Sequence, residues 1–160
     1  EPTTALDVTV QSEVMAILME QVRSRGLGLV FVTHDLDLAA AVTDSISVMY
    51  AGRVVESGSS DAVSAHPAHP YTAGLLASRP RLDRVERLTA IPGRPIAAFE
   101  AGPGCPFAPR CGFATEECRT VPPELRELRV LRKPGGLGGE QVACHHAETL
   151  RGSRSIGATA

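Results

Sequence analysis

The sequence has 160 residues, and its hydrophobic share of 43% is enough for the core of one domain. Sixteen basic and eighteen acidic residues give a net charge of -2, which excludes a broad positive field for nucleic acid or anionic lipid. The longest apolar stretches, Leu27 to Val32 and Leu36 to Val42, are shorter than the ~20 residues that cross a bilayer.

The first part of the chain alternates helical and strand patterns. Apolar residues recur on one helical face from Val10 to Val22, and Gly26 is a stop signal, which predicts a helix over Val8 to Arg25. Leu27 to Thr33 is a short apolar run with β-branched members. We expect it to form a parallel strand that is buried on both faces of an α/β sheet.

Shorter elements follow, each with its own start signal. They are a helix through Leu38 to Val42 capped by Asp35, hairpin strands Ser45 to Tyr50 and Arg53 to Ser57 joined at Ala51-Gly52, a short helix from Ser59 or Ser60, and a helix over Tyr71 to Ala77 after Pro70. The segment from Arg79 to Gly104 is rich in Pro and Gly, which marks a boundary. We expect residues 149–160, which are mostly small and polar, to form a disordered tail.

Three polar side chains of the first part are candidates for chemistry. Glu1 and Asp7 frame the opening segment EPTTALD, and Asp7 or Thr9 would be suited to cap the first helix. His34 follows the predicted strand, at the end where α/β sheets bind ligands, and it could donate a hydrogen bond to a phosphate oxygen. A lone histidine at such a place is otherwise a structural residue.

The segments EPTTALDVTVQ, VFVTHDL and VMYAGRVVESG, in this order and spacing, resemble the second half of the nucleotide-binding domain of ABC transporters. The resemblance covers about residues 1–60 and implies an α/β fold, the C-terminal part of a P-loop ATPase domain. It implies that Glu1 is the catalytic carboxylate after the Walker B strand, that Asp7 belongs to the D-loop at the dimer and nucleotide interface, and that His34 is the switch histidine. Glu1 would polarise the attacking water and His34 would stabilise charge on the γ-phosphate.

Other parts of such a site do not occur in this sequence. There is no G-x-x-x-x-G-K-[ST] loop to hold the phosphates, no Asp directly before Glu1 to help bind Mg²⁺, no glutamine loop and no Ser-Gly-Gly signature. We interpret the chain as a C-terminal fragment that carries the hydrolytic half of the site. The intact subunit would use ATP and Mg²⁺, and the isolated fragment is predicted to be inactive.

A second resemblance covers about Val63 to Glu148. HPAHPYTAGLLASRP, IPGRP, GCPFAPRC and VACHHAE resemble the C-terminal extension of oligopeptide and dipeptide importer ATPases, which sets an extension at 61–148 after the ATPase part at 1–60. The resemblance implies import of peptides, with nickel as a variant, at the cytoplasmic face of the bacterial inner membrane. The implied partners are a second ATP-binding subunit, transmembrane permease subunits and, indirectly, an extracytoplasmic peptide-binding protein. Nucleic acid is not among them.

All four cysteines, Cys105, Cys111, Cys118 and Cys144, lie in this extension. Structural zinc usually shows a pair two to four residues apart, which is absent here, and a reducing cytosol disfavours disulfides. A [4Fe-4S] cluster takes four thiolates at varied spacings. The resemblance favours the cluster, because this arrangement is associated with one in some members, while zinc and unliganded thiols stay as alternatives.

Histidines add two further questions. His145 and His146 beside Cys144 could replace a thiolate ligand or could be solvent-exposed polar residues. His66 and His69 could also bind a metal, but the prolines between them and after them indicate a helix entrance. The alternative function is therefore a stand-alone iron-sulfur or zinc module without ATPase activity, and the α/β first half weighs against it.

Overall fold

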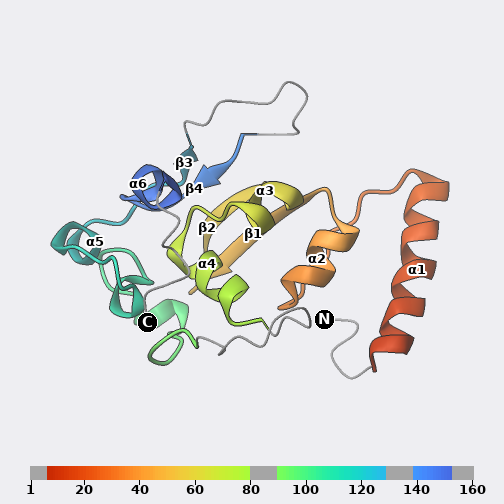
Figure 1. Ribbon diagram of the computed structural model, residues 1–160, viewed down its shortest axis with the longest axis horizontal. Helices are drawn as coiled ribbons and strands as arrows, with labels where there is room; N and C mark the ends of the chain where they lie inside the picture. Colours follow the sequence, from red (N-terminus) through yellow and green to blue (C-terminus); the bar gives the residue numbers. More distant parts are fainter. Residues whose placement is uncertain (1–6, 80–89, 129–138, 153–160) are drawn as a thin grey trace. The chain divides into compact units, whose positions relative to one another are not determined.

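The structure, a computed structural model, describes residues 7–79, 90–128 and 139–152 and divides into two compact units between Asp44 and Ser45 (Figure 1). The first unit contains α1 (Val8–Arg25) and α2 (Leu36–Val42). The second contains β1 (Ser45–Tyr50), β2 (Arg53–Ser59), α3 (Ser60–Ala65), α4 (Pro70–Ala77), η1 (Ala98–Glu100), η2 (Ala108–Arg110), α5 (Glu116–Thr120), β3 (Arg126–Glu127), β4 (Gln141–Val142) and α6 (Ala147–Gly152). In these described ranges, no helix has the length and apolar character needed to span a membrane.

The helices of the first unit are set by local capping. The Asp7 carboxylate accepts hydrogen bonds from the N–H groups of Thr9 and Val10, both at 3.0 Å. Gly26 ends α1 with a φ of 61°, a left-handed conformation that favours glycine. The carboxylate of Asp35 caps α2 in the same way as Asp7 caps α1. The predicted helices and their start signals are confirmed.

The buried parallel strand predicted at Leu27–Thr33 is not formed. This segment joins α1 to α2 without regular secondary structure, and Val30 and Val32 are 92% and 68% exposed. A strand that is buried on both faces needs neighbouring strands, and the sheet formed by the described residues consists of β1 to β4, all in the second unit. The prediction is wrong here because the described part of the first unit supplies no strand to pair with it.

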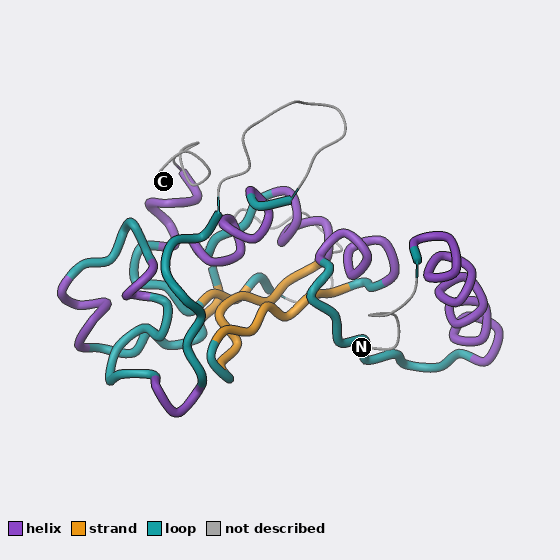
Figure 2. The backbone as a smooth tube through the Cα atoms, turned by 90° about the horizontal axis from the view of Figure 1, so that it is seen from below, coloured by secondary structure: helices purple, strands orange, loops and turns teal. Residues whose placement is uncertain are grey.

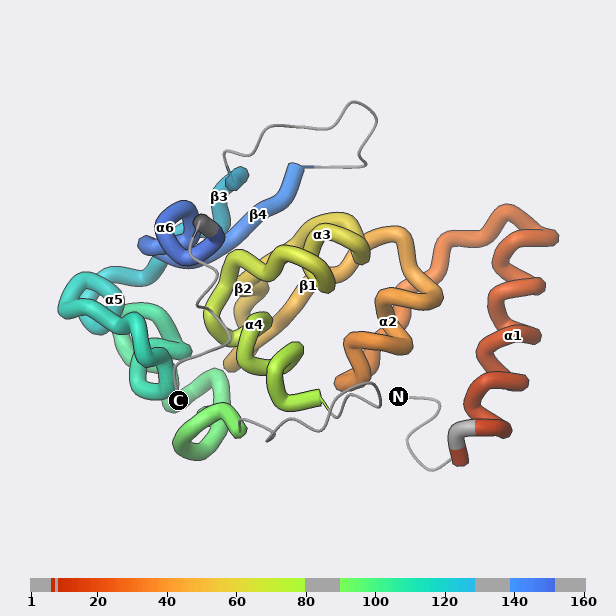
Figure 3. The backbone as a smooth tube through the Cα atoms, in the orientation of Figure 1, coloured from red at the N-terminus to blue at the C-terminus, as the bar shows by residue number. Residues whose placement is uncertain are grey.

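The sheet of the second unit is antiparallel in the order β1-β2-β4-β3 (Figure 3). Alternate residues of β1, namely Ile46, Val48 and Tyr50, are buried. Ala51 and Gly52 connect β1 to β2 with φ angles of 46° and 76°, as a two-residue hairpin turn with two left-handed residues requires. The predicted hairpin is confirmed, and β4 adds to its β2 edge.

The entrance of α4 is a buried hydrogen-bonded junction. The Glu56 side chain on β2 accepts hydrogen bonds from the N–H groups of Ala68 and His69, at 2.6 and 3.0 Å. Burial raises the pKa of the Glu56 carboxyl, and these two hydrogen bonds oppose that rise. The His69 ring caps α4, because its Nδ1 accepts from the N–H of Tyr71 at 3.1 Å. Pro70 occupies the first turn, so the predicted helix entrance is confirmed.

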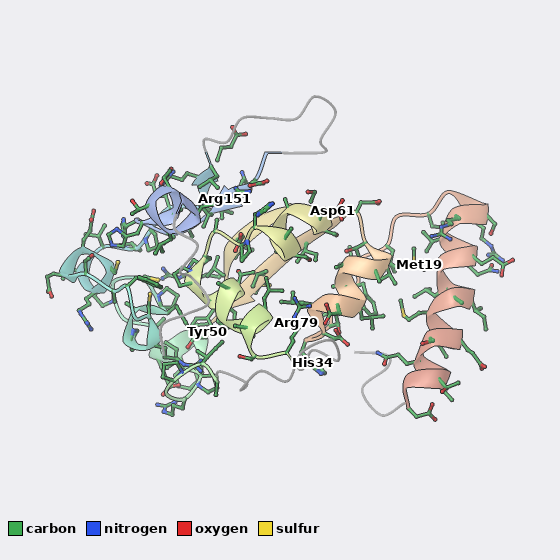
Figure 4. All side chains as sticks on the ribbon, viewed as in Figure 1. Met19, His34, Tyr50, Asp61, Arg79 and Arg151 are labelled. Atoms are coloured by element: carbon green, nitrogen blue, oxygen red, sulfur yellow. The ribbon has the colours of Figure 1, made fainter. Side chains whose placement is uncertain are left out.

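An aromatic cluster packs beside this junction. Tyr50, labelled in Figure 4, lies with its ring centroid 4.8 Å from that of Tyr71 and 5.3 Å from that of Phe107. The Arg110 guanidinium lies over two of these rings, and its Nε donates to the carbonyl of Pro92 at 2.7 Å. These contacts attach the segment after α4 to the sheet and place Phe107 close to the cysteines.

Residues 149–152, which we expected to begin a disordered tail, belong to α6 instead. Ala147 and Leu150 are buried in one cluster with Val142 and Leu128, so apolar contacts hold this last helix against β4 and the residue after β3. The remaining residues of the expected tail lie outside the described part of the chain.

The buried His69 predicts a pH dependence of stability. Burial lowers the pKa of His69 from 6.5 to about 4, so the unfolded chain takes up a proton first as the pH falls. The free energy of unfolding should therefore decrease between pH 6.5 and pH 4, by on the order of 3 kcal/mol in total. His69→Asn keeps a capping acceptor without a titrating ring and should flatten this part of a urea-unfolding pH profile. An unchanged slope in that variant would contradict the assignment.

Candidate functional site

The residues assigned to ATP chemistry belong to the first unit. Glu1, Ala5 and Leu6 lie outside the described residues. Asp7 is exposed and its carboxylate is used as the cap of α1. His34, labelled in Figure 4, is exposed and directly precedes Asp35, the N-cap of α2. The roles of these three side chains stay predictions.

The second unit brings together all four predicted cysteines, which line one partly open cavity. Cys105 and Cys111 lie on either side of η2, Cys118 is in α5, and Cys144 follows β4. Figure 2 shows that loops make up much of the described chain. The other walls are mostly apolar or aromatic, and they include His69, Pro70, Phe107, Ala108, Phe113, Pro123 and Leu150. The four thiols are free.

A backbone contact holds two of these cysteine segments together. The N–H of Cys105 donates to the carbonyl of Cys118 at 2.8 Å. Gly104 lies so close that a Cβ there would be 2.3 Å from the same carbonyl oxygen and 2.5 Å from the backbone of Arg119. No side chain fits in that space, so glycine is required for Cys105 to reach α5.

Backbone hydrogen bonds lower the pKa of three of the thiols. They come from Phe107 and Ala108 at Cys105, from Phe113 at Cys111 and from His146 at Cys144. Hydrogen bonds to sulfur favour the thiolate over the thiol. The local backbone is therefore arranged for negative charge on these three side chains.

Burial acts in the opposite direction. Burial raises the pKa of the Cys105 and Cys111 thiols, and it raises the pKa of Cys144 to about 12. The pKa of about 12 at Cys144 includes a smaller contribution from charge on the neighbouring cysteines, because the four sulfurs share one cavity. Four thiolates could coexist there only with a positively charged group among them.

The side chains are not arranged around one metal ion. Among the residues that the structure describes, no group of three or more His, Cys, Asp or Glu could hold a metal ion. A tetrahedral zinc would require each sulfur within about 2.3 Å of a single point. The four thiols therefore line one cavity, but the described side chains do not form a binding site for a single metal ion.

The two adjacent histidines have different surroundings. The Nε2 atom of His146 lies 3.1 Å from Thr115 Oγ1 and 3.5 Å from Cys118 Sγ. His145 also lines the cavity, but its Nε2 lies 3.0 Å from the Val121 carbonyl. Sequence reasoning missed Thr115. The available signal was its place three residues before Cys118, at the N-cap of a short helix.

The sequence of this chain is similar to those of known proteins. Residues 55–118 match the family model described as the oligopeptide/dipeptide transporter C-terminal region. The chain is 48% identical over 123 residues, 76% of its length, to the oligopeptide transport ATP-binding protein OppD of Haemophilus influenzae. It is 48% identical over 154 residues, 95% of its length, to the protein of that name from Mycobacterium tuberculosis. With the one from Escherichia coli it shares 47% over 124 residues, 77% of its length.

The matched segments cover 38%, 24% and 37% of these three relatives, respectively, so the chain corresponds to less than half of each. The chain belongs to the family of oligopeptide and dipeptide transport ATP-binding proteins.

The close backbone contact at Gly104 can be tested directly. Gly104→Ala should lower the free energy of unfolding by about 1–3 kcal/mol or more, because the added methyl group overlaps a backbone oxygen. Gly102→Ala is a matched control, since a Cβ at Gly102 meets no atom within 4 Å. Urea unfolding of both variants measures the difference. Equal stabilities would show that the segments of Cys105 and Cys118 do not approach each other as described.

Proposed function

We propose that this sequence forms part of the ATP-hydrolysing subunit of an importer for oligopeptides or dipeptides. The observation that carries the proposal is the match to the Mycobacterium tuberculosis relative, which extends over 95% of this chain. It therefore includes the segment of Asp7 and His34 as well as the cysteine-bearing extension. The match of residues 55–118 to a region specific to oligopeptide and dipeptide transporters supports the class of cargo.

In this function the residues of the first unit act at the γ-phosphate. Glu1 would orient and polarise the attacking water, His34 would donate a hydrogen bond to the phosphate, and Asp7 would face the second ATP-binding subunit. The P-loop of the intact subunit would supply most of the contacts to ATP and Mg²⁺. The subunit would act peripherally at the cytoplasmic face of the bacterial inner membrane, through permease subunits that receive peptides from an extracytoplasmic binding protein.

A stand-alone metal-binding module is the less favoured alternative. The relatives are named as ATP-binding transport proteins, and one of them matches this chain over 95% of its length. A stand-alone metal-binding module would also not require the segment around His34, which resembles the switch-histidine segment of ABC ATPases.

The role of His34 can be measured in a chimera that joins this chain to the residues of the Escherichia coli relative that it does not match. His34→Ala should lower kcat for ATP hydrolysis by roughly 100-fold and change nucleotide affinity little, because its hydrogen bond strengthens as charge shifts in the transition state. His66→Ala, an exposed histidine after α3, is the control and should retain turnover. Equal turnover in both variants would make His34 a structural residue.

We also propose that Cys105, Cys111, Cys118 and Cys144 hold one [4Fe-4S] cluster. The support is that all four thiols line one cavity and that backbone N–H groups donate to three of the sulfurs. A cluster has its own iron and sulfide core between the thiolates, so it needs a wider spacing of the sulfurs than zinc does. When bound, it would supply a four-point crosslink and a one-electron redox centre.

Metal analysis tests this cofactor. Protein purified without oxygen should be brown, with about four iron and four sulfide per chain. Cys144→Ser should reduce the iron content and expose the extension to proteases, because it removes the ligand that ties the end of β4 to the other cysteines. One zinc per chain and no iron would replace the cluster with the tetrahedral alternative. Neither metal would leave four unliganded thiols.

A further inference from the structure

Cys118 differs from the other three cysteines in the partners of its sulfur. It is the third residue of α5, and its Sγ lies 3.4 Å from Thr115 Oγ1 and 3.5 Å from His146 Nε2. The partners described for the sulfurs of Cys105 and Cys144 are backbone N–H groups of residues close by in the chain. The partners of Cys118 are side chains, and His146 is 28 residues away in sequence.

Thr115 occupies the N-cap position of α5 but makes no side-chain capping bond. A threonine at this position ordinarily accepts a hydrogen bond from the helix backbone. Its hydroxyl lies instead between two side chains, 3.4 Å from Cys118 Sγ and 3.1 Å from His146 Nε2. The capping interaction has been replaced by contacts at the edge of the thiol cavity.

The chemistry of the three groups decides the direction of their hydrogen bonds. A metal-bound cysteine is a thiolate, which can only accept. The Thr115 hydroxyl must then donate its single proton to Cys118, and it can accept at the same time from His146. The imidazole of His146 must carry a proton on Nε2 to donate to either neighbour. One arrangement is consistent with all three contacts, in which Thr115 and the Cys118 sulfur share the single Nε2–H of His146.

We propose that His146 and Thr115 form a hydrogen-bond relay that ends on the Cys118 sulfur and raises the reduction potential of the bound cluster. This inference rests on the proposed [4Fe-4S] cluster. Reduction by one electron adds negative charge to the cluster and its thiolates, so a donor to sulfur stabilises the reduced form more than the oxidised one. His146 and Thr115 are positioning residues in this role, and the four cysteines remain the ligands.

His145 provides a matched control within the same dipeptide. Its Nε2 lies 3.0 Å from the Val121 carbonyl and its Nδ1 3.7 Å from Glu117 Oε1. Both ring nitrogens of His145 therefore contact groups other than the cysteine sulfurs. Truncation of His145 should disturb the local packing about as much as truncation of His146, without removing a donor to sulfur.

The test is a dithionite titration of the anaerobically purified chain, followed by optical and electron paramagnetic resonance spectra. His146→Ala should keep about four iron per chain and shift the midpoint potential to a more negative value. Thr115→Val should shift it in the same direction, because it removes the hydroxyl and keeps the shape. His146→Gln retains an N–H donor and should recover most of the wild-type potential, and His145→Ala should leave the potential unchanged.

The possible outcomes separate this inference from the cofactor proposal. A wild-type chain without iron rejects the cluster, and the relay with it. A wild-type chain with four iron, and equal potentials in wild type, His146→Ala and Thr115→Val, rejects the relay and leaves the cluster intact. Loss of iron in His146→Ala, with iron retained in His145→Ala and Thr115→Val, would identify His146 as a ligand and overturn its assignment as a donor.

Discussion

The buried carboxylate of Glu56 joins the parts of the second unit that build the cysteine cavity. On β2 it accepts hydrogen bonds from the N–H groups of Ala68 and His69, which fixes the entrance of α4 and the ring of His69 on the cavity wall. Glu56 is also opposite Val142 in the ladder between β2 and β4. Because Cys144 follows Val142 by two residues, the same short piece of β2 positions two sides of the cavity.

After α4, the described residues of the extension form only short helices and strands. Its strands β3 and β4 have two residues each, and α5 has five. Specific hydrogen bonds stabilise these segments instead. The Arg110 guanidinium donates to the carbonyl of Pro92, and the N–H of Cys105 donates to the carbonyl of Cys118. A cofactor bound to all four cysteines would add a long-range crosslink between Cys144 and the segment that carries the other three.

The cysteines are under two opposing influences. The apolar walls favour neutral thiols, as the raised pKa of Cys144 shows, whereas the backbone and side-chain donors around the sulfurs favour thiolates. Such a combination makes a cavity that tolerates four negative sulfurs only with a compensating cation. The side chains of Thr115 and His146 act on Cys118, whereas the backbone of His146 acts on Cys144.

Local features of this protein could be predicted from the sequence by itself. The caps Asp7, Asp35 and Ser59, the stop at Gly26 and the hairpin turn at Ala51-Gly52 all act on residues a few positions away. These interactions need no information about distant parts of the chain. The motifs that resemble transport ATPases could likewise be recognised in the sequence, and a relative named as a transport ATP-binding protein matches 95% of the chain.

Long-range pairing was decided only by the tertiary structure. The apolar run at Leu27–Thr33 has the composition of a buried strand, but its exposure depends on which strands are available to pair with it. The sequence named the four cysteines, but not that they share one cavity, nor that His145 and His146 face different groups. These facts depend on how β2, β4 and α5 bring distant segments together, and chain spacing does not encode that geometry.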